Sequence, residues 1–365
     1  MRKTITTSFS ITLLLLNLLS SMFIVSIINN KFSIITVVDA QPSNALKYCY
    51  KFQWGSEGED DGQFLRPHDV AFDSEGFVYI NDRERNDIQK FTPDGKFIEK
   101  FGEKGDNLGE FRSPYSMVID SEDNIYVIDR GNDRVQKVST NGTPIAAWDS
   151  IDGRVITSDD DEIKEEDQDE EDNNGEDNKK PNNPAEEKLK HFASPEAMTI
   201  DKQGNFYLTD TNNNRVIKFN KDFKYISQFG IVGSQPGQFD HPHGIGIDSK
   251  GNLYINELNN PRIQKFTNNG TFIKQWGSNG TAPGQFTLPL EHLEVDKTDK
   301  VFMVDSAKNP RIQVFDTEGN FITQFGKYGV GNGEFHKPEH VTVDKDGNVY
   351  VVDRGNHRIQ VFSPC

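Results

Sequence analysis

The chain has 365 residues, with 57 acidic residues against 40 Lys or Arg, and a formal charge of −17. Residues 159–177 hold 13 acidic residues and one Lys, which leaves only −5 for everything else. Nucleic-acid binding needs clustered Lys and Arg that neutralise phosphates, so this balance argues against a nucleic-acid partner. With only two Cys, a zinc module of the His/Cys type is also excluded.

Residues 1–40 are expected to form a secretory signal peptide or an N-terminal membrane anchor. Arg2 and Lys3 precede an apolar run from Ile11 to Ile28, and a small-residue cleavage site fits at Ala40. The run is long for a signal core and short for a membrane span, so both alternatives stay open. The rest of the chain is expected to be secreted or extracytoplasmic, and membrane-anchored if the segment is uncleaved.

From residue 44 to residue 365 one pattern recurs six times. An Asp follows the first apolar run of each repeat, and these Asp residues lie 47, 81, 47, 48 and 48 positions apart. A period in the forties, made of short alternating apolar runs, is typical of β-propeller blades. The predicted fold class is therefore all-β, a six-bladed propeller of four-stranded antiparallel blades. The six marker residues are Asp73, Asp120, Asp201, Asp248, Asp296 and Asp344.

The first repeat shows the four strands of a blade, named a to d in chain order. Strands a and b are apolar runs that flank a turn at Gly76. Strands c and d alternate with period two on either side of Pro93-Asp94-Gly95, which predicts a hairpin. In a propeller the b–c loops and the d–a connections share one face, called here the top face.

The last repeat ends at Cys365 before any strand d, whereas residues 48–55 resemble a strand d without a blade. The N-terminal strand is therefore expected to complete the last blade, which closes the ring and removes two exposed sheet edges. This closure brings Cys49 beside Cys365. Two Cys in an exported chain are then expected to form a disulfide.

Residues 148–191 interrupt the repeat between blades 2 and 3. Their Asp/Glu/Asn-rich composition offers too little apolar surface to offset the entropy of ordering, so residues 149–190 are expected to be a disordered acidic loop. As a d–a connection, this loop would lie on the top face. It is either an inert spacer or a weak collector of cations such as Ca²⁺.

The pattern Gly-x-Phe-x-x-Pro, then apolar-x-apolar-Asp-x-x-Gly-Asn, then Tyr-Val-x-Asp-Arg-Gly-Asn-x-Arg-Ile-Gln resembles the NHL repeat family. Residues 333–362 match it almost throughout, and all six repeats match to some degree. The resemblance implies a six-bladed propeller that binds through its top face. Relatives include RNA- and protein-binding domains of tripartite-motif proteins and the lyase that completes peptide amidation, so the family does not fix the function.

Polar residues recur five positions before each marker, where strand a begins at the mouth of the channel. Imidazoles and carboxylates that converge there could hold a divalent metal, Zn or Ca, or could simply line a wet opening. His292 and His340, at the next position, extend the set. The six occupants of the first position are His68, Tyr115, Glu196, His243, Glu291 and Glu339.

The family's lyase branch carries metal-binding His in Pro-His segments and a substrate-binding Arg after a b–c Asp. Pro67-His68 with Asp82-Arg83 matches that arrangement, and Pro242-His243 matches its His part. However, the lyase pattern needs three such His from alternating blades. His68 and His243, the metal candidates, come from opposite blades, which does not support a three-His site.

An acidic residue recurs nine positions after each marker, and Arg follows it in three blades. These arginines, Arg83, Arg130 and Arg354, come from adjacent blades and are the candidate site for an anion or a partner's carboxylates. A second Arg, farther along, is expected to pair with the acid and order the b–c loop. That second set is Arg134, Arg215, Arg262, Arg311 and Arg358.

Asn-Gly-Thr sequons at Asn141, Asn269 and Asn279 lie on predicted turns and are candidate glycan sites. The sequence thus favours an exported, monomeric, non-catalytic scaffold that binds a protein or a small molecule on its top face. The alternative is a metal-dependent lyase or lactonase with its site at the channel mouth. Copurifying metal that is lost in His68→Ala with His243→Ala would favour the enzyme.

Overall fold

The computed structural model describes residues 22–28, 31–37, 46–152, 155–157 and 190–365. It divides into a unit spanning Met1–Ala45 and a second unit, Leu46–Cys365. In the first unit β1 (Met22–Ile28) pairs antiparallel with β2 (Lys31–Val37). Most of the predicted signal or anchor lies outside the described residues. Within the described part of the chain, no helix is long and apolar enough to cross a membrane.

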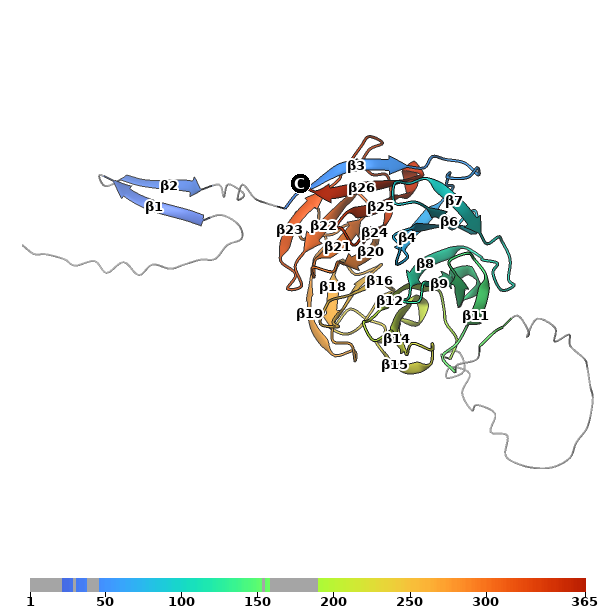
Figure 1. Ribbon diagram of the computed structural model, residues 1–365. Helices are drawn as coiled ribbons and strands as arrows, with labels where there is room; N and C mark the ends of the chain where they lie inside the picture. The colour runs from blue at the N-terminus through green and yellow to red at the C-terminus, as the bar shows by residue number, and fades with distance from the viewer. Residues whose placement is uncertain (1–21, 29–30, 38–45, 153–154, 158–189) are drawn as a thin grey trace, which may run out of the picture. The chain divides into compact units, whose positions relative to one another are not determined.

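The second unit is a ring of six four-stranded antiparallel sheets (Figure 1). In each blade strand a is innermost and strand d is outermost, which confirms the predicted fold class. Blade 1 consists of β4 (Pro67–Phe72), β5 (Val78–Asp82), β6 (Asp87–Phe91) and β7 (Phe97–Phe101). Blade 2 consists of β8 (Pro114–Ile119), β9 (Asn124–Asp129), β10 (Arg134–Ser139) and β11 (Pro144–Trp148). Blade 3 consists of β12 (Pro195–Ile200), β13 (Phe206–Asp210), β14 (Arg215–Phe219) and β15 (Tyr225–Phe229).

Blades 4 to 6 continue the same order around the ring. Blade 4 consists of β16 (Pro242–Ile247), β17 (Leu253–Glu257), β18 (Ile263–Phe266) and β19 (Phe272–Trp276). Blade 5 consists of β20 (Leu290–Val295), β21 (Val301–Asp305), β22 (Arg311–Phe315) and β23 (Phe321–Phe325). Blade 6 consists of β24 (Pro338–Val343), β25 (Val349–Asp353), β26 (Arg358–Pro364) and β3 (Tyr48–Trp54).

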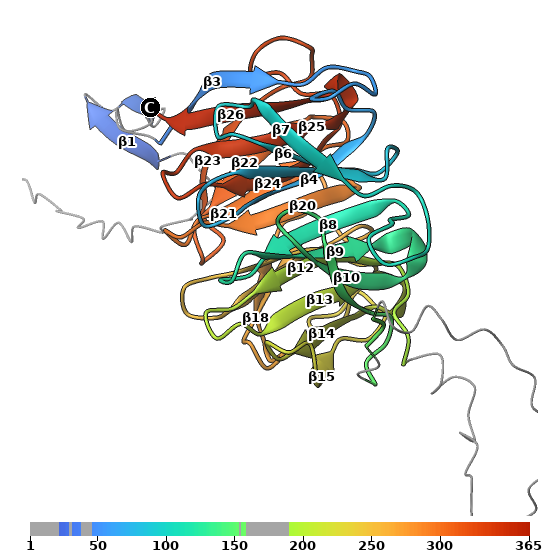
Figure 2. The same cartoon turned by 45° about the vertical axis from the view of Figure 1, so that its right-hand side comes forward.

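The ring closes as expected from the sequence, because β3 supplies the outer strand of blade 6 and runs beside β26 (Figure 2). Cys49 lies opposite Ser363 in this register, and Cys49 and Cys365 form a disulfide with Cα atoms 6.0 Å apart. The bridge joins residues 316 positions apart. In the chain-entropy model a loop of that length stabilises the fold by roughly 5–6 kcal/mol.

The hydrophobic core lies between neighbouring blades and not within one sheet. Val70 and Ile80 of blade 1, for example, are buried against Val352 and Ile359 of blade 6. Since apolar side chains fill the space between blades, the polar residues of strand a are left facing the central channel. The core therefore holds six inner strands in place around one axis.

Buried ion pairs order the b–c loops, as the sequence analysis predicted. Each pair joins the acid that ends strand b to an Arg at the first position of strand c or, in blade 4, directly before it, and both members are largely buried. In blade 2, Arg134 also donates to the carbonyls of Asn107 and Glu110, so the loop is tied to the preceding d–a connection. The pairs are Arg134–Asp129 (2.8 Å), Arg215–Asp210 (2.7 Å), Arg262–Glu257 (2.6 Å), Arg311–Asp305 (3.1 Å) and Arg358–Asp353 (2.7 Å).

The base of the acidic insertion is hydrogen-bonded, unlike the wholly disordered loop expected for residues 149–190. Phe192 donates to the carbonyl of Asp149 (3.1 Å), and Ile151 donates to that of Lys190 (2.8 Å). Ile156 pairs with Ala147 on the edge of β11 through two backbone hydrogen bonds. These contacts exist because backbone groups beside an open sheet edge satisfy one another. Residues 153–154 and 158–189 lie outside the described residues.

Candidate functional site

A β-bulge at the start of strand a sets the geometry of the channel. In every blade the register between strands a and b shifts after the first residue of strand a; in blade 1 the shift falls between Pro67 and Asp69. A bulge re-aims side chains that strict alternation would send to opposite faces. The residues five and four positions before each marker therefore form two successive layers around the axis, called here the mouth layer and the middle layer.

The mouth layer is joined by a chain of polar contacts. Glu339 lies 3.6 Å from Nε2 of His68, whose Nδ1 is 2.7 Å from the carbonyl oxygen of Tyr115. The Tyr115 hydroxyl is 3.0 Å from Nε2 of His243, which in turn lies 3.5 Å from Glu196. The predicted convergence of five of these residues, from blades 6, 1, 2, 4 and 3, is thus present. All five are buried, so their polar atoms contact one another and are largely shielded from bulk solvent.

Tyr115 is the centre of this layer. Its ring centroid lies 3.8 Å from that of His68 and 5.8 Å from that of His243. The guanidinium of Arg83 lies 4.4 Å from the same centroid, and that of Arg130 lies 5.2 Å away. Such cation–π contacts strengthen where water is excluded, so the ring serves as a platform for the cations of the top face.

Burial shifts the protonation of the mouth layer. It raises the pKa of Glu291 well above its usual range, and repulsion by Glu339 adds to the shift. Both effects favour the protonated form of Glu291 relative to an exposed carboxyl. Burial also lowers the pKa of His68 well below its usual range, and the nearby Arg83 adds to that effect, so the imidazole is neutral.

Of the three candidate arginines, only Arg83 lacks a carboxylate partner. Arg130 forms an ion pair with Glu196 (3.0 Å), and Arg354 pairs with Glu339. Two of the three candidates for the anion site thus already have a carboxylate partner in the mouth layer. Nε of Arg83 donates to Oγ of Ser113 (3.1 Å), and Arg83 forms no ion pair with any acidic residue that the structure describes.

His292 and His340 do not lie at the mouth, contrary to the prediction, but in the middle layer. Nε2 of His340 is 2.9 Å from Oδ1 of Asp69, and the two imidazole rings stack with centroids 3.7 Å apart. Asp69 also accepts a hydrogen bond from the backbone of Met117 (2.6 Å). The bulge explains this placement, since it turns the second residue inward below the first.

The metal candidates His68 and His243 do not point at a common position, because the Tyr115 ring lies between them. Within the described parts of the chain, no group of three or more His, Cys, Asp or Glu side chains is arranged to hold a metal ion. The residues present therefore do not fit a resident metal at the mouth.

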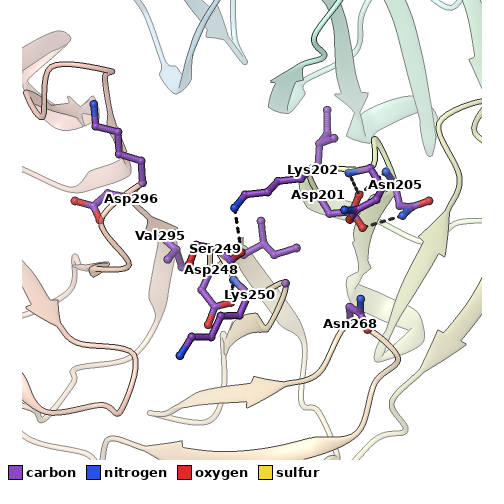
Figure 3. Close-up of a pocket in the computed structure, with 14 residues that line it drawn as sticks. Asp201, Lys202, Asn205, Asp248, Ser249, Lys250, Asn268, Val295 and Asp296 are labelled. Carbon is purple, nitrogen blue, oxygen red and sulfur yellow. Dashed lines mark hydrogen bonds between the residues drawn. The ribbon is translucent and has the colours of Figure 1, made fainter.

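Two of the cavities away from the mouth bear on function. One, of about 250 Å³, is inside the channel and is lined by His292, Glu294 and His340 among others. The other, of about 770 Å³, lies over the a–b turns of blades 3 to 5 (Figure 3). Sequence reasoning missed Glu294, although it stands two positions before a marker where no other repeat has an ionisable residue.

The acids of the larger cavity cap their own turns. Oδ1 of Asp248 accepts from the backbones of Lys250 and Asn252. Oδ2 of Asp201 accepts from the side-chain amide of Asn205 (Figure 3). Lys202 reaches across to the carbonyl of Ser249 (3.0 Å). These marker Asp residues are thus structural parts of the repeat.

Comparison with family models agrees with this geometry. An NHL-repeat model matches residues 192–219, and a model of a six-bladed β-propeller, the DUF5128 domain, matches residues 56–145 and 290–363. The chain is a six-bladed β-propeller, part of which matches the NHL-repeat model.

Among curated proteins, the propeller is similar to E3 ubiquitin-protein ligase TRIM71 of Bos taurus, 47% identical over 47 residues, which are 13% of this chain and 5% of TRIM71. Protein wech of Drosophila melanogaster is 39% identical over 59 residues, 16% of this chain and 7% of wech. The chain thus spans only a small part of these relatives, and their activities do not carry over to it.

Solved structures share the fold at low identity. Virginiamycin B lyase from Staphylococcus aureus aligns with a TM-score of 0.53 at 15% identity over 87% of this chain and 99% of the lyase. XC5397, a gluconolactonase from Xanthomonas campestris, aligns with a TM-score of 0.56 at 11% identity over 84% of this chain and 88% of that one. A Bacteroides thetaiotaomicron protein of unknown function aligns with a TM-score of 0.61 at 14% identity, over 96% of this chain and 83% of that protein.

The three sequons lie on exposed surface. Asn141 and Asn269 are in the c–d turns of blades 2 and 4, and Asn279 follows β19. In the sequons of Asn141 and Asn269, the hydroxyl of the Thr two positions later donates a hydrogen bond to the Asn side-chain oxygen, at 2.9 and 3.1 Å respectively. The Asn side chains are thus accessible to modification.

Proposed function

We propose that this propeller is an exported, non-catalytic recognition scaffold whose top face binds a carboxylate-bearing ligand, such as an acidic segment of a protein partner. Arg83 carries the proposal. Its guanidinium is held in place by Ser113 and the Tyr115 ring and has no acidic partner among the residues the structure describes. Arg is suited to this role because its planar fork binds a carboxylate through two parallel hydrogen bonds.

The electrostatic surroundings of Arg83 favour an incoming anion. Burial lowers the pKa of Arg83 from its ordinary value, and the nearby Arg66 and Arg130 lower it further. A half-buried cation beside like charges gains more from a carboxylate than a fully solvated one does. Arg130 and Arg354 already form ion pairs with carboxylates. They therefore border the site, and Arg83 is the residue that binds the ligand.

Fluorescence anisotropy with a dye-labelled hexaglutamate peptide at low salt tests the proposal. Arg83→Gln should weaken binding by about tenfold or more, the range for loss of one well-made charged contact. Arg112→Gln is the matched control, because Arg112 is an exposed top-face arginine already paired with Asp106. Equal affinity for both variants and the unchanged protein would contradict the proposal.

Export is a further part of the proposal and is supported by the disulfide that closes the ring. Mass spectrometry of the mature protein would identify its N-terminus and so separate cleavage from anchoring. Glycans at Asn141, Asn269 or Asn279 in the same spectra would support passage through a secretory pathway.

An enzyme at the mouth layer is the second candidate. It is favoured by Glu291, a carboxyl whose pKa is raised by burial and by the adjacent Glu339, since perturbed carboxyl groups recur at catalytic sites. A lyase or lactonase would use Glu291 as a proton donor and neutral His68 as a base. Assays of lactones and streptogramins with Glu291→Gln, together with elemental analysis of His68→Ala with His243→Ala, would decide between enzyme and scaffold.

A further inference from the structure

The cavity of about 250 Å³ lies below the mouth layer and is independent of the Arg83 site. Its walls reach Phe72, Ile119 and Ile200, the last residues of three inner strands. It therefore extends toward the a–b turns, whereas no mouth-layer residue lines it. A small molecule would reach it from the face opposite the top face. Its volume equals that of about eight water molecules.

Glu294 gives this lumen its charge. The corresponding position in the other blades is Ala71, Val118, Thr199, Gly246 and Thr342, so Glu294 is the one ionisable residue at its level. Its carboxyl makes no hydrogen bond or ion pair with any residue that the structure describes. Burial raises the pKa of Glu294 to about 8, with added repulsion from Asp69 and Asp296.

Two imidazoles beside Glu294 also have unused atoms. Nδ1 of His292 and Nδ1 of His340 are buried without a hydrogen-bond partner, and the residues are 7% and 5% exposed. In its neutral form, His340 donates from Nε2 to Asp69, which leaves Nδ1 as an acceptor. Both nitrogens are enclosed by protein atoms, so a molecule in the lumen contacts the imidazole rings and not these two atoms.

The rest of the wall is mixed, because the hydroxyls of Ser116, Thr199 and Thr342 line it together with apolar side chains. Met198, Ile119 and Ile200 are the apolar residues of blades 2 and 3 in this wall. A lumen with one unpaired carboxyl, hydroxyl groups and a small apolar area matches a cationic donor that carries only a short hydrocarbon chain. A bare divalent metal fits less well, since in the described residues no three His, Cys, Asp or Glu side chains are arranged around one point.

We propose that this lumen binds a small organic cation, a primary ammonium on a short alkyl chain. The ammonium contacts the carboxylate of Glu294 and lies beside the imidazole rings of His292 and His340, while the short alkyl chain packs against Met198, Ile119 and Ile200. Entry is from the a–b turn face, because the cavity extends toward the ends of the inner strands and no mouth-layer residue lines it.

Isothermal titration calorimetry with n-butylammonium chloride tests this site at a pH above the Glu294 pKa of about 8. The protein should bind n-butylammonium and not 1-butanol, which has the same chain without the charge. Glu294→Gln should weaken binding by about tenfold or more. Glu122→Gln, which alters an exposed acid on the a–b turn of blade 2, should leave it unchanged.

Thr199→Leu provides a second, independent variant. It fills part of the lumen at the level of Glu294 without changing any charge, and should also weaken n-butylammonium binding. Urea unfolding of each variant establishes that it is folded. Equal binding by Glu294→Gln, equal binding of 1-butanol, or no binding by the unchanged protein would overturn the proposal. Since Arg83 lies on the top face, Arg83→Gln should leave this titration unaltered, which separates the two proposals.

Discussion

The hydroxyl of Tyr115 lies 3.0 Å from Nε2 of His243, so a blade 2 side chain reaches a blade 4 side chain across the channel. No backbone pairing links these two blades, since each sheet contains strands of one repeat, apart from the blade that β3 completes. The contact therefore ties non-neighbouring blades together in the mouth layer.

Tyr115→Phe removes this hydroxyl while keeping the ring beneath Arg83 and Arg130. Because His243 is buried, loss of its partner should lower the free energy of unfolding by about 1–3 kcal/mol. Urea denaturation followed by tryptophan fluorescence measures the change. Tyr225→Phe is the control, since Tyr225 is 40% exposed on the outer strand of blade 3. Similar losses in both variants would show that the contact contributes nothing specific.

Replacing both cysteines, Cys49→Ser with Cys365→Ser, should lower the free energy of unfolding by up to roughly 5–6 kcal/mol. The physical reason is that the unfolded chain regains the freedom of a loop between residues 316 positions apart. Urea unfolding with and without reductant is the measurement. Reductant should destabilise the unchanged protein and leave the double variant unaffected; identical midpoints for the two proteins would contradict the role assigned to the bridge.

Asp353→Ala should be among the more destabilising single changes, at about 3–5 kcal/mol, because it leaves the buried guanidinium of Arg358 without its carboxylate. The matched control is Asp94→Ala, which removes an exposed acid whose partner Lys96 is also exposed. Exposed pairs of this kind add little, so the unfolding midpoint of that variant should not move. Thermal unfolding compares the midpoints of the two variants. If Asp94→Ala lost more stability than Asp353→Ala, the buried ion pairs would not be the source of rigidity in the b–c loops.

The ring, its closure by residues 48–54, the disulfide and the Arg–acid pairs were all predictable from the sequence. They follow from a repeat period and from partners at fixed short spacings, such as Asp129 with Arg134. The pairing of Arg130 with Glu196 was not predictable in this way, because the two residues are 66 positions apart and meet only when blades 2 and 3 pack.

The repeat pattern also could not predict how deep in the channel His292 and His340 lie. Counting positions from a marker assumes strict alternation, whereas the bulge at the start of strand a turns two successive residues inward. Glu294 did have a signal in the sequence, as a single acid among small or apolar residues at the same repeat position. Its significance depends on the lumen, which only the folded ring forms.

Glu294 makes the stability of the propeller depend on pH in a defined direction. Below the unfolded-state pKa of 4.5 both states hold the proton, so the group has no effect. As the pH rises from there to the folded-state pKa of about 8, only the unfolded state loses the proton. The free energy of unfolding should therefore fall across this window, by up to about 1.4 kcal/mol per pH unit from this group.

Glu294→Gln cannot ionise and should flatten the pH dependence between 4.5 and about 8, so that the variant gains stability over the unchanged protein as the pH rises. Urea unfolding at a series of pH values measures both curves. Glu122→Gln alters an exposed acid of the same type and should keep the slope of the unchanged protein. If Glu294→Gln also kept the slope of the free energy of unfolding against pH, the Glu294 carboxyl would be solvated and not enclosed. The lumen would then lack the buried negative charge on which cation binding depends.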